Sequence, residues 1–235
     1  MAEGSNLSDR RVVHALALGL DPAWRLLAPL ERCQTADELV AAIRLESDVT
    51  THCYSMVGLH PGADLLLWSL APSLDSLEER SAKVLRTGMG RWMAVKESFL
   101  GVIQPSQYVK KPTPQEQSLF SGERSRYLVV YPFTKSTDWY LLGGDERQRI
   151  MNEHMKVGHG YPEVRQLLAY SFGIDDMDFL VAYETDDLPK FGELVRALRG
   201  TESRRSTVRD TPILTGIHRP IEEITALLGA TNDER

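Results

Sequence analysis

The sequence is poor in cysteine. Cys33 and Cys53 are the only two in 235 residues, and they form no closely spaced CxxC pair. Disulfide-stabilised domains carry several cysteines, and zinc ribbons carry closely spaced pairs. We therefore expect free thiols in a reducing cytoplasm rather than a disulfide framework or a zinc ribbon.

The sequence also lacks long apolar runs and an excess of positive charge. No stretch approaches the roughly 20 apolar residues that cross a bilayer, and the first residues, MAEGSNLSDRR, contain no apolar segment after their charges. The formal net charge of −6 disfavours binding to a phosphate backbone. These features predict a cytoplasmic protein with no membrane span and no nucleic-acid partner.

Common nucleotide-binding and hydrolase motifs are missing as well. No P-loop or GxSxG occurs, and the GxG of TGMGRW, near Gly90, ends a predicted helix instead of opening one after a strand. A dinucleotide site is therefore not expected there.

An internal repeat is present. The stretches ADLLLWSLAPSLDSL (63–77) and MDFLVAYETDDLPKF (177–191) both read as an apolar strand followed by an amphipathic helix. Placing Asp64 on Asp178 aligns the apolar positions of the two copies. Each copy also follows a glycine turn, GLHPGAD or GIDDMD, which indicates a hairpin between two strands.

Extended outward, both halves predict the order strand, helix, strand, strand, helix, strand. This βαββαβ order is typical of ferredoxin-like modules. The predicted fold class is α+β, with two ferredoxin-like modules forming a dimeric α+β barrel within one chain. The expected parts are an N-terminal module (1–110), a linker (111–126), a C-terminal module (127–220) and a tail (221–235) whose short helix frays into solvent.

His154 is the first candidate for chemistry. In ERQRIMNEHMKVG it follows Ile150 by four positions and Met151 by three, so its imidazole projects from an apolar stripe. It is either a core histidine bonded to a backbone carbonyl or an axial ligand to haem iron. Zinc is less favoured, because His159 does not share its helix face.

Several other side chains have both a structural and a functional interpretation. Glu202, in LRGTES, is either a solvated helix-end carboxylate or the acceptor that orients a ligating histidine. In YPFTKSTDWYLL, Tyr131 and Lys135 are either strand-end packing or a redox-active phenol and a propionate anchor, although Pro132 is expected to end strand pairing. Trp139 suits a core or a porphyrin-edge wall.

The run ESRRSTVR is the remaining basic cluster. It is either a solvated face or a receiver of carboxylates, in which case Arg205 and Arg209 are the candidate donors.

Taken together, these residues resemble the chlorite dismutase family of haem proteins, which includes the coproheme decarboxylases. The resemblance covers nearly the whole chain, from YSMVGLHPGADLLLW and GRWMAVKESFLGVI to YPFTK, DWYLL, RIMNEHMKVG, FGIDDMDFLVAYETDDLPKF and LRGTE. It implies a pair of ferredoxin-like modules in one barrel, haem in the C-terminal module, and a homopentamer.

The resemblance assigns a role to each candidate. His154 matches the proximal iron ligand, and Glu202 matches the carboxylate that orients it. Tyr131 matches the tyrosine radical of coproheme decarboxylases, Lys135 matches a lysine next to a propionate, and Trp139 matches a tryptophan of the haem pocket.

The distal position separates the subfamilies. Chlorite dismutases place an arginine where this chain has Gln166, and Firmicute-type coproheme decarboxylases carry glutamine there. Arg165 is adjacent, but neighbours on a strand point to opposite faces, so it should not substitute.

Other positions depart from the decarboxylases. Their propionate-binding arginine falls on Gln117, a serine falls near Pro212, and a second arginine falls on Ser206. The short spacing from Lys135 to Trp139 is nearer to chlorite dismutases, so the chain lies between subfamilies.

The favoured function is oxidative decarboxylation of coproheme III to haem b by hydrogen peroxide, with porphyrin and peroxide as partners. Two alternatives stay open. One is chlorite dismutation, and the other is haem binding or transport with incidental peroxidase activity.

Overall fold

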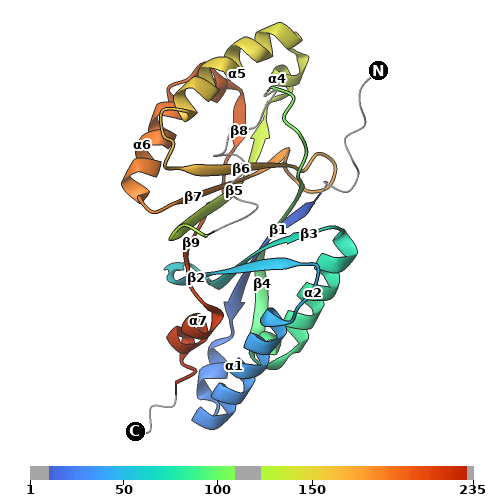
Figure 1. The fold of residues 1–235 in the computed structure, drawn as a ribbon, viewed down its shortest axis with the longest axis vertical. Helices are drawn as coiled ribbons and strands as arrows, with labels where there is room; N and C mark the ends of the chain where they lie inside the picture. Colours follow the sequence, from blue (N-terminus) through green and yellow to red (C-terminus); the bar gives the residue numbers. More distant parts are fainter. Residues whose placement is uncertain (1–10, 109–122, 232–235) are drawn as a thin grey trace. The chain divides into compact units, whose positions relative to one another are not determined.

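The computed structural model describes residues 11–108 and 123–231. It contains both helices and antiparallel strands, as the α+β class predicts (Figure 1). The chain divides into two compact units, which are Met1–Val102 together with Thr215–Arg235 (unit 1) and Ile103–Leu214 (unit 2). Most of the expected linker, including Gln117, lies outside the described residues. No helix in the described ranges combines the length and apolarity that a membrane crossing requires.

Unit 1 contains an antiparallel sheet and three α-helices. Its elements are β1 (Val12–Leu20), η2 (Pro22–Leu26), α1 (Pro29–Arg44), β2 (Thr50–His60), β3 (Ala63–Ala71), α2 (Leu74–Arg86), η3 (Gly88–Trp92), β4 (Met93–Val102) and α7 (Ile221–Leu228). Strand β1 lies between β4 and β3, and β3 lies between β1 and β2. Strand β9 (Leu214–His218) pairs with β2 through its last residues.

The sequence dictates the elements of unit 1 directly. Strand β3 reads ADLLLWSLA, and all of its residues except Asp64 are buried. The Ser73 hydroxyl then caps α2 by accepting from the Ser76 backbone N–H at 3.1 Å. The glycine-turn prediction is confirmed, because His60 pairs with Ala63 across a turn in which Gly62 has φ +85°.

Helix α7 corrects the expectation of a solvent-frayed tail. Ile221, Ile224 and Leu228 are buried in the unit 1 core with Trp24 and Leu39. Burying each such side chain stabilises the fold by roughly 1.5–3 kcal/mol. The apolar residues of IEEITALL therefore belong to the core of unit 1, and this segment is not a frayed terminus.

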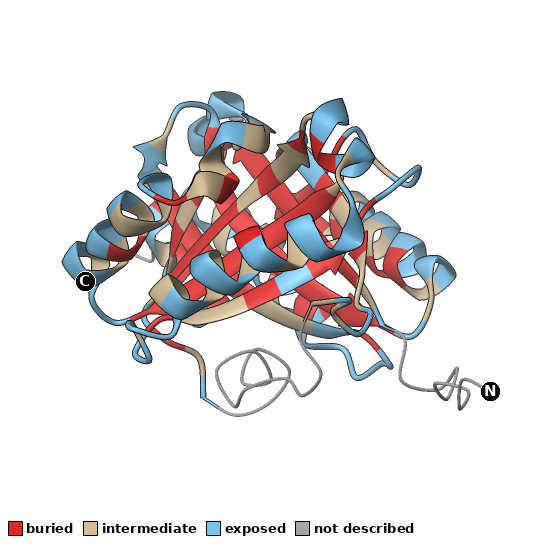
Figure 2. Ribbon diagram, turned by 90° about the horizontal axis from the view of Figure 1, so that it is seen from above, coloured by how far each residue is buried: buried red, intermediate tan, exposed pale blue. Residues whose placement is uncertain are grey.

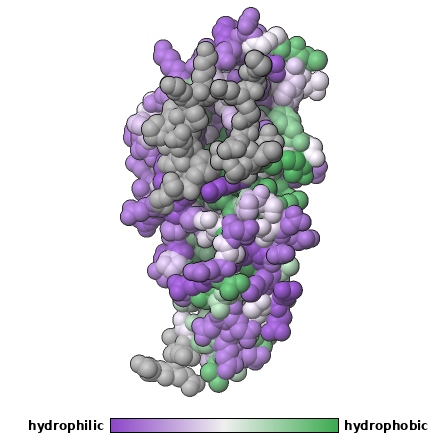
Figure 3. All heavy atoms as spheres, turned by 45° about the vertical axis from the view of Figure 1, so that its right-hand side comes forward, coloured by the Kyte–Doolittle hydropathy of each residue, from purple (hydrophilic) through white to green (hydrophobic). Residues whose placement is uncertain are grey.

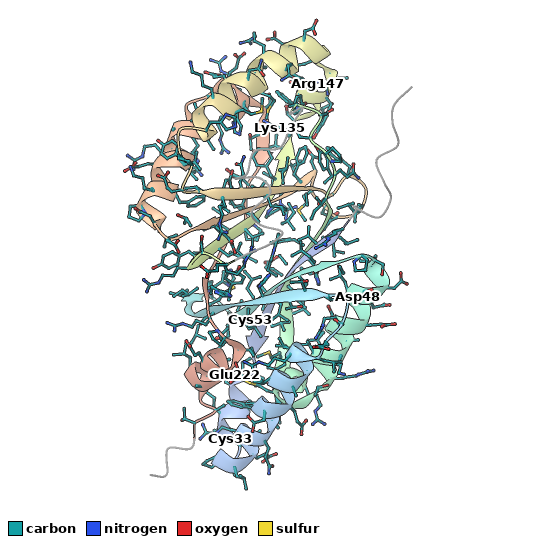
Figure 4. All side chains as sticks on the ribbon, viewed as in Figure 1. Cys33, Asp48, Cys53, Lys135, Arg147 and Glu222 are labelled. Carbon is teal, nitrogen blue, oxygen red and sulfur yellow. The ribbon has the colours of Figure 1, made fainter. Side chains whose placement is uncertain are left out.

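Cys33 and Cys53 both lie in unit 1, and neither is part of a disulfide. Burial, together with the nearby negative charge of Glu222, raises the pKa of the Cys53 thiol to about 12; Figure 4 labels both residues. Cys53 is therefore an uncharged core residue at neutral pH.

Unit 2 also consists of antiparallel strands and helices. Its elements are β5 (Tyr127–Lys135), α4 (Thr137–Leu141), α5 (Gly144–Gly158), β6 (Arg165–Tyr170), β7 (Phe179–Thr185), α6 (Leu188–Arg199), η5 (Glu202–Ser206) and β8 (Thr207–Arg209). Strand β7 lies between β6 and β5, and β8 pairs with the end of β5. Figure 2 shows buried residues along the strands and exposed residues on the outer faces of the helices.

Strand β5 runs further than the sequence predicts. Pro132 was expected to end its pairing, but Pro132 lies opposite Leu180 in β7 and the ladder continues to Phe133. The next two residues pair with β8. Every second residue of a strand points to the same face. Because the strand continues, Tyr131, Phe133 and Lys135 therefore share one face of the sheet.

Candidate functional site

Lys135 ends β5 as a buried cation. Its Nζ donates to the backbone oxygen and to the hydroxyl of Ser203, both at 2.8 Å, and lies 4.6 Å from the centroid of the Trp139 ring. Burial lowers its pKa from 10.5 to about 8, and the positive charge of Arg204 adds to this. The amine therefore stays mostly protonated at pH 7 but is held in a site that disfavours a lone cation.

His154 lies on α5 with its ring partly buried. Burial lowers its pKa from 6.5 to about 4, Lys135 lowers it further, and Glu153 opposes the change. Its Nδ1 is buried and has no hydrogen-bond partner among the described residues. A neutral imidazole is the form that ligates a metal, and the unpartnered Nδ1 leaves a position for the acceptor that orients such a ligand, so this residue fits the haem iron that the sequence predicts.

Glu202 does not contact His154 in this structure. Its carboxylate accepts from Arg149 at 2.9 Å, and the same guanidinium pairs with Glu146 at 2.7 Å. The backbone N–H of Glu202 donates to Glu153 at 3.1 Å. These contacts join η5 to α5, the helix that carries the histidine.

Tyr131 forms a pair with Tyr183. Their rings stack with centroids 6.1 Å apart, and their hydroxyls share a hydrogen bond. Burial raises the pKa of Tyr131 far above its usual value, and Tyr183 and Asp210 add to this. The phenol is therefore neutral throughout the physiological range. It belongs to an apolar cluster with Phe133.

Gln166 lies on the same face of the sheet as Tyr131. In the register, Gln166 is opposite Tyr183, while Leu168 and Tyr131 flank the same residue, Val181. Leu168 is 43% exposed even though Val181 and Tyr183 beside it are buried. This face of the sheet is therefore partly uncovered at Leu168, two residues from Gln166 on β6.

Arg165 points to the opposite face, as expected. It pairs with the buried carboxylate of Glu184 at 2.9 Å and donates to the Ser125 hydroxyl at 2.7 Å. The prediction that Arg165 and Gln166 point to opposite faces of the strand is confirmed, and that Arg165 does not replace Gln166 in function stays a prediction.

The predicted carboxylate receivers in the basic run differ from one another. Arg209 donates to the backbone oxygens of Asp176 at 2.7 Å and Thr211 at 3.1 Å, so its guanidinium is largely engaged. Arg205 is exposed and makes no hydrogen bond or ion pair to a described residue. Arg204, which the sequence did not single out, pairs with Asp210.

Sequence reasoning also missed Arg147, Ser203 and Tyr183. Arg147 precedes His154 by seven positions, a spacing that returns to the same helix face, so it could have been found from the sequence. Ser203 and Tyr183 carry no such signal, because only the fold brings them to Lys135 and Tyr131.

Apolar side chains are exposed in unit 2, and Figure 3 shows hydrophobic surface gathered in the upper part of that view. The large apolar residues of this unit that are more than a third exposed are Tyr140, Leu141, Leu168, Phe172, Ile174, Val208 and Ile213. The rings of Tyr140 and Phe172 meet edge to face with centroids 5.8 Å apart. Such surface suits a large apolar ligand or a protein contact.

The chain is similar in sequence to known proteins. The family model described as chlorite dismutase matches residues 31–219. A coproheme decarboxylase from Mycolicibacterium smegmatis is 30% identical over 203 residues, which cover 84% of this chain and 87% of the relative.

The chain is also similar in fold to solved structures of chlorite dismutases. A mutant chlorite dismutase from Candidatus Nitrospira defluvii has a TM-score of 0.85 at 27% identity and covers 94% of this chain and 96% of its own. Chlorite dismutase from the same organism in complex with imidazole has a TM-score of 0.84 at 27% identity and covers 94% and 95%. The chain therefore belongs to the chlorite dismutase family.

Proposed function

We propose that this protein is a haem-dependent oxidoreductase that converts coproheme III to haem b with hydrogen peroxide. In each step a propionate and one peroxide molecule give a vinyl group, carbon dioxide and two water molecules. The observation that carries the proposal is the neutral His154 imidazole with its unpartnered Nδ1, close enough to the buried Lys135 ammonium for that charge to lower its pKa. The relative named coproheme decarboxylase supports the choice of substrate.

Chlorite dismutases and coproheme decarboxylases use haem or coproheme iron. In the proposed mechanism His154 holds the iron through its imidazole. Bound iron supplies the redox chemistry that activates peroxide. Glu202 is the proposed acceptor for the Nδ1 proton of His154 when iron is held, and the hydrogen bond from its backbone N–H to Glu153 brings η5 to the helix that carries His154.

Each remaining side chain has one task. Lys135 Nζ binds the carboxylate of the reacting propionate, and its hydrogen bonds to Ser203 fix the direction of the amine. Tyr131 would pass one electron to the oxidised cofactor and release its phenolic proton, and the resulting phenoxyl would take a hydrogen atom from the propionate side chain, which restores the phenol. Gln166 offers a neutral amide donor to peroxide on the partly uncovered sheet face, and Trp139 forms the pocket wall. Arg205, which is exposed, is the more available receiver for an outer carboxylate, because Arg209 is largely engaged by backbone oxygens.

We also propose that each unit is a ferredoxin-like module and that the two modules form one α+β barrel. The element order and the central positions of β3 and β7 support the module assignment.

The exposed apolar residues of unit 2 support self-association, and we propose a cytoplasmic homopentamer. Light scattering on the purified protein tests the subunit number.

The test is release of carbon dioxide from coproheme and peroxide, compared among three proteins. We expect Tyr131→Phe to lose nearly all activity because the transferable electron and proton are gone. Tyr127→Phe, on the same strand, is the matched control and should retain activity. A Tyr131→Phe variant as active as the unchanged protein would contradict the proposed redox role of Tyr131.

Chlorite dismutation is the second candidate, favoured by the TM-scores of the solved structures. The neutral Gln166 argues against it, because the resemblance places an arginine there in chlorite dismutases. Rapid oxygen release from chlorite would overrule the first choice.

Haem binding or transport is the third candidate. It is favoured by Arg209, which is engaged by backbone oxygens rather than free for a propionate. Reversible transfer of haem b with coproheme left unchanged would support it.

A further inference from the structure

Arg147 is a cation of unit 2 that the proposed mechanism does not use. It lies on the less exposed side of α5, on the same face as the buried Ile150 and two turns before His154. Its Nε is buried and has no hydrogen-bond partner among the described residues. A buried donor left without a partner costs free energy, so the position suits a group that arrives with a ligand.

The surroundings of Arg147 are aromatic. Its charge acts on two phenols, since it opposes the burial that raises the pKa of Tyr108 and of Tyr140. The Tyr108 ring lies 6.4 Å from the Trp139 ring, and Trp139 lies beneath Lys135 Nζ. Arg147 and Lys135, both labelled in Figure 4, therefore come from two elements to the same group of aromatic rings.

The nearby acids do not neutralise this arginine. Asp178 accepts from the Tyr140 hydroxyl at 2.6 Å and from the Lys135 backbone N–H at 2.7 Å. Glu146, beside Arg147 on α5, is paired with Arg149 at 2.7 Å. Among the described residues, no carboxylate forms an ion pair with Arg147, and its charge acts on the phenols of Tyr108 and Tyr140.

We propose that Arg147 binds a carboxylate of the porphyrin held at His154, as a second anchor beside Lys135. This inference rests on the proposed function and deepens it, because it assigns the site to porphyrins that carry a carboxylate arm on the side of Tyr108 and Tyr140. A guanidinium matches a carboxylate with two parallel N–H donors, and flat rings beside it suit the porphyrin face.

Titration of the apo-protein with coproheme, followed by the visible spectrum, tests the proposal without requiring turnover. Arg147→Gln should weaken coproheme binding about tenfold, which corresponds to about 1.4 kcal/mol. It should also reduce the salt dependence of the dissociation constant, which loss of a purely structural contact would not change. Arg147→Lys, which keeps the charge, should retain most of the affinity.

Arg196→Gln, at an exposed position on α6, is the matched control and should leave binding unchanged. A parallel titration with haem b locates the carboxylate. Loss for coproheme alone assigns it to an arm that haem b lacks, and loss for both assigns it to a shared arm; either supports the anchor.

Coproheme affinity and salt dependence in Arg147→Gln equal to those of the unchanged protein would overturn the inference while leaving the proposed function intact. Failure of the unchanged protein to bind either porphyrin would overturn both.

Discussion

The ammonium of Lys135 lies 4.6 Å above the ring of Trp139, and the same Nζ donates two hydrogen bonds to Ser203. The cation is therefore buried against an aromatic face and fixed by a neighbouring segment rather than by a carboxylate. A site of this kind has affinity for an incoming anion, because burial leaves the positive charge only partly compensated.

This arrangement predicts a rise of stability in mild alkali. The pKa of Lys135 is lowered from 10.5 to about 8, so between these values the unfolded chain binds the proton and the folded chain does not. The free energy of unfolding should therefore rise between pH 8 and pH 10, by up to about 3 kcal/mol. Denaturant unfolding of the apo-protein measures it. Lys135→Met should flatten the rise, and the exposed Lys156→Met should keep it.

The same titration should weaken ligand binding. Above pH 8 the Lys135 ammonium loses its proton and with it the attraction for a propionate, so coproheme affinity should fall as pH rises from 7 to 9. A pH-independent affinity in this range would exclude Lys135 as the anchor.

His154 predicts a loss of stability in mild acid. Its pKa is lowered from 6.5 to about 4, so the unfolded chain binds more protons between these values and stability falls as pH decreases through them. His154→Gln should remove this part of the pH dependence, whereas His159→Gln, exposed on the same segment, should not. Unfolding of the apo-proteins at pH 7 and pH 5 distinguishes them.

Tyr183 predicts a change in rate without a change in binding. Tyr183→Phe removes the hydrogen bond that holds the Tyr131 hydroxyl but keeps the stacked ring. We expect decarboxylation to slow by roughly tenfold, equivalent to one lost hydrogen bond of about 1.4 kcal/mol. Coproheme affinity should stay the same. Equal rates for Tyr183→Phe and the unchanged protein would show that this bond does not position Tyr131.

Helix α7 predicts a stability effect away from the site. Ile224 is fully buried in the unit 1 core, so Ile224→Ala should destabilise the fold by roughly 2–5 kcal/mol. Leu227 on the same helix is 54% exposed, and Leu227→Ala should cost far less. Chemical denaturation compares the two variants, and similar costs would mean that α7 frays in solution.

The strand and helix order was predictable because apolar periodicity and capping residues are local signals. Strand β3 and the Ser73 cap show this, because the apolar run of the strand and the capping hydroxyl of the helix each depend on only a few consecutive residues. Helix α4 was not predicted, because five residues are too few for a periodic pattern and DWYLL read as a strand end.

Contacts between distant segments were harder to predict from the sequence. His154 could be proposed from its place in an apolar stripe, but the pairing of Glu202 with Arg149 depends on how η5 meets α5. The continuation of β5 through Pro132 likewise depends on its partner strand, which tolerates the missing N–H.

The most direct test of the central claim is the identity of the porphyrin after reaction. The apo-protein is mixed with coproheme III, hydrogen peroxide is added in portions, and the bound porphyrin is identified by mass. The account predicts haem b, preceded by a species that has lost a single propionate as a vinyl group. Coproheme that binds in a His154-dependent manner but keeps all of its propionates would contradict it.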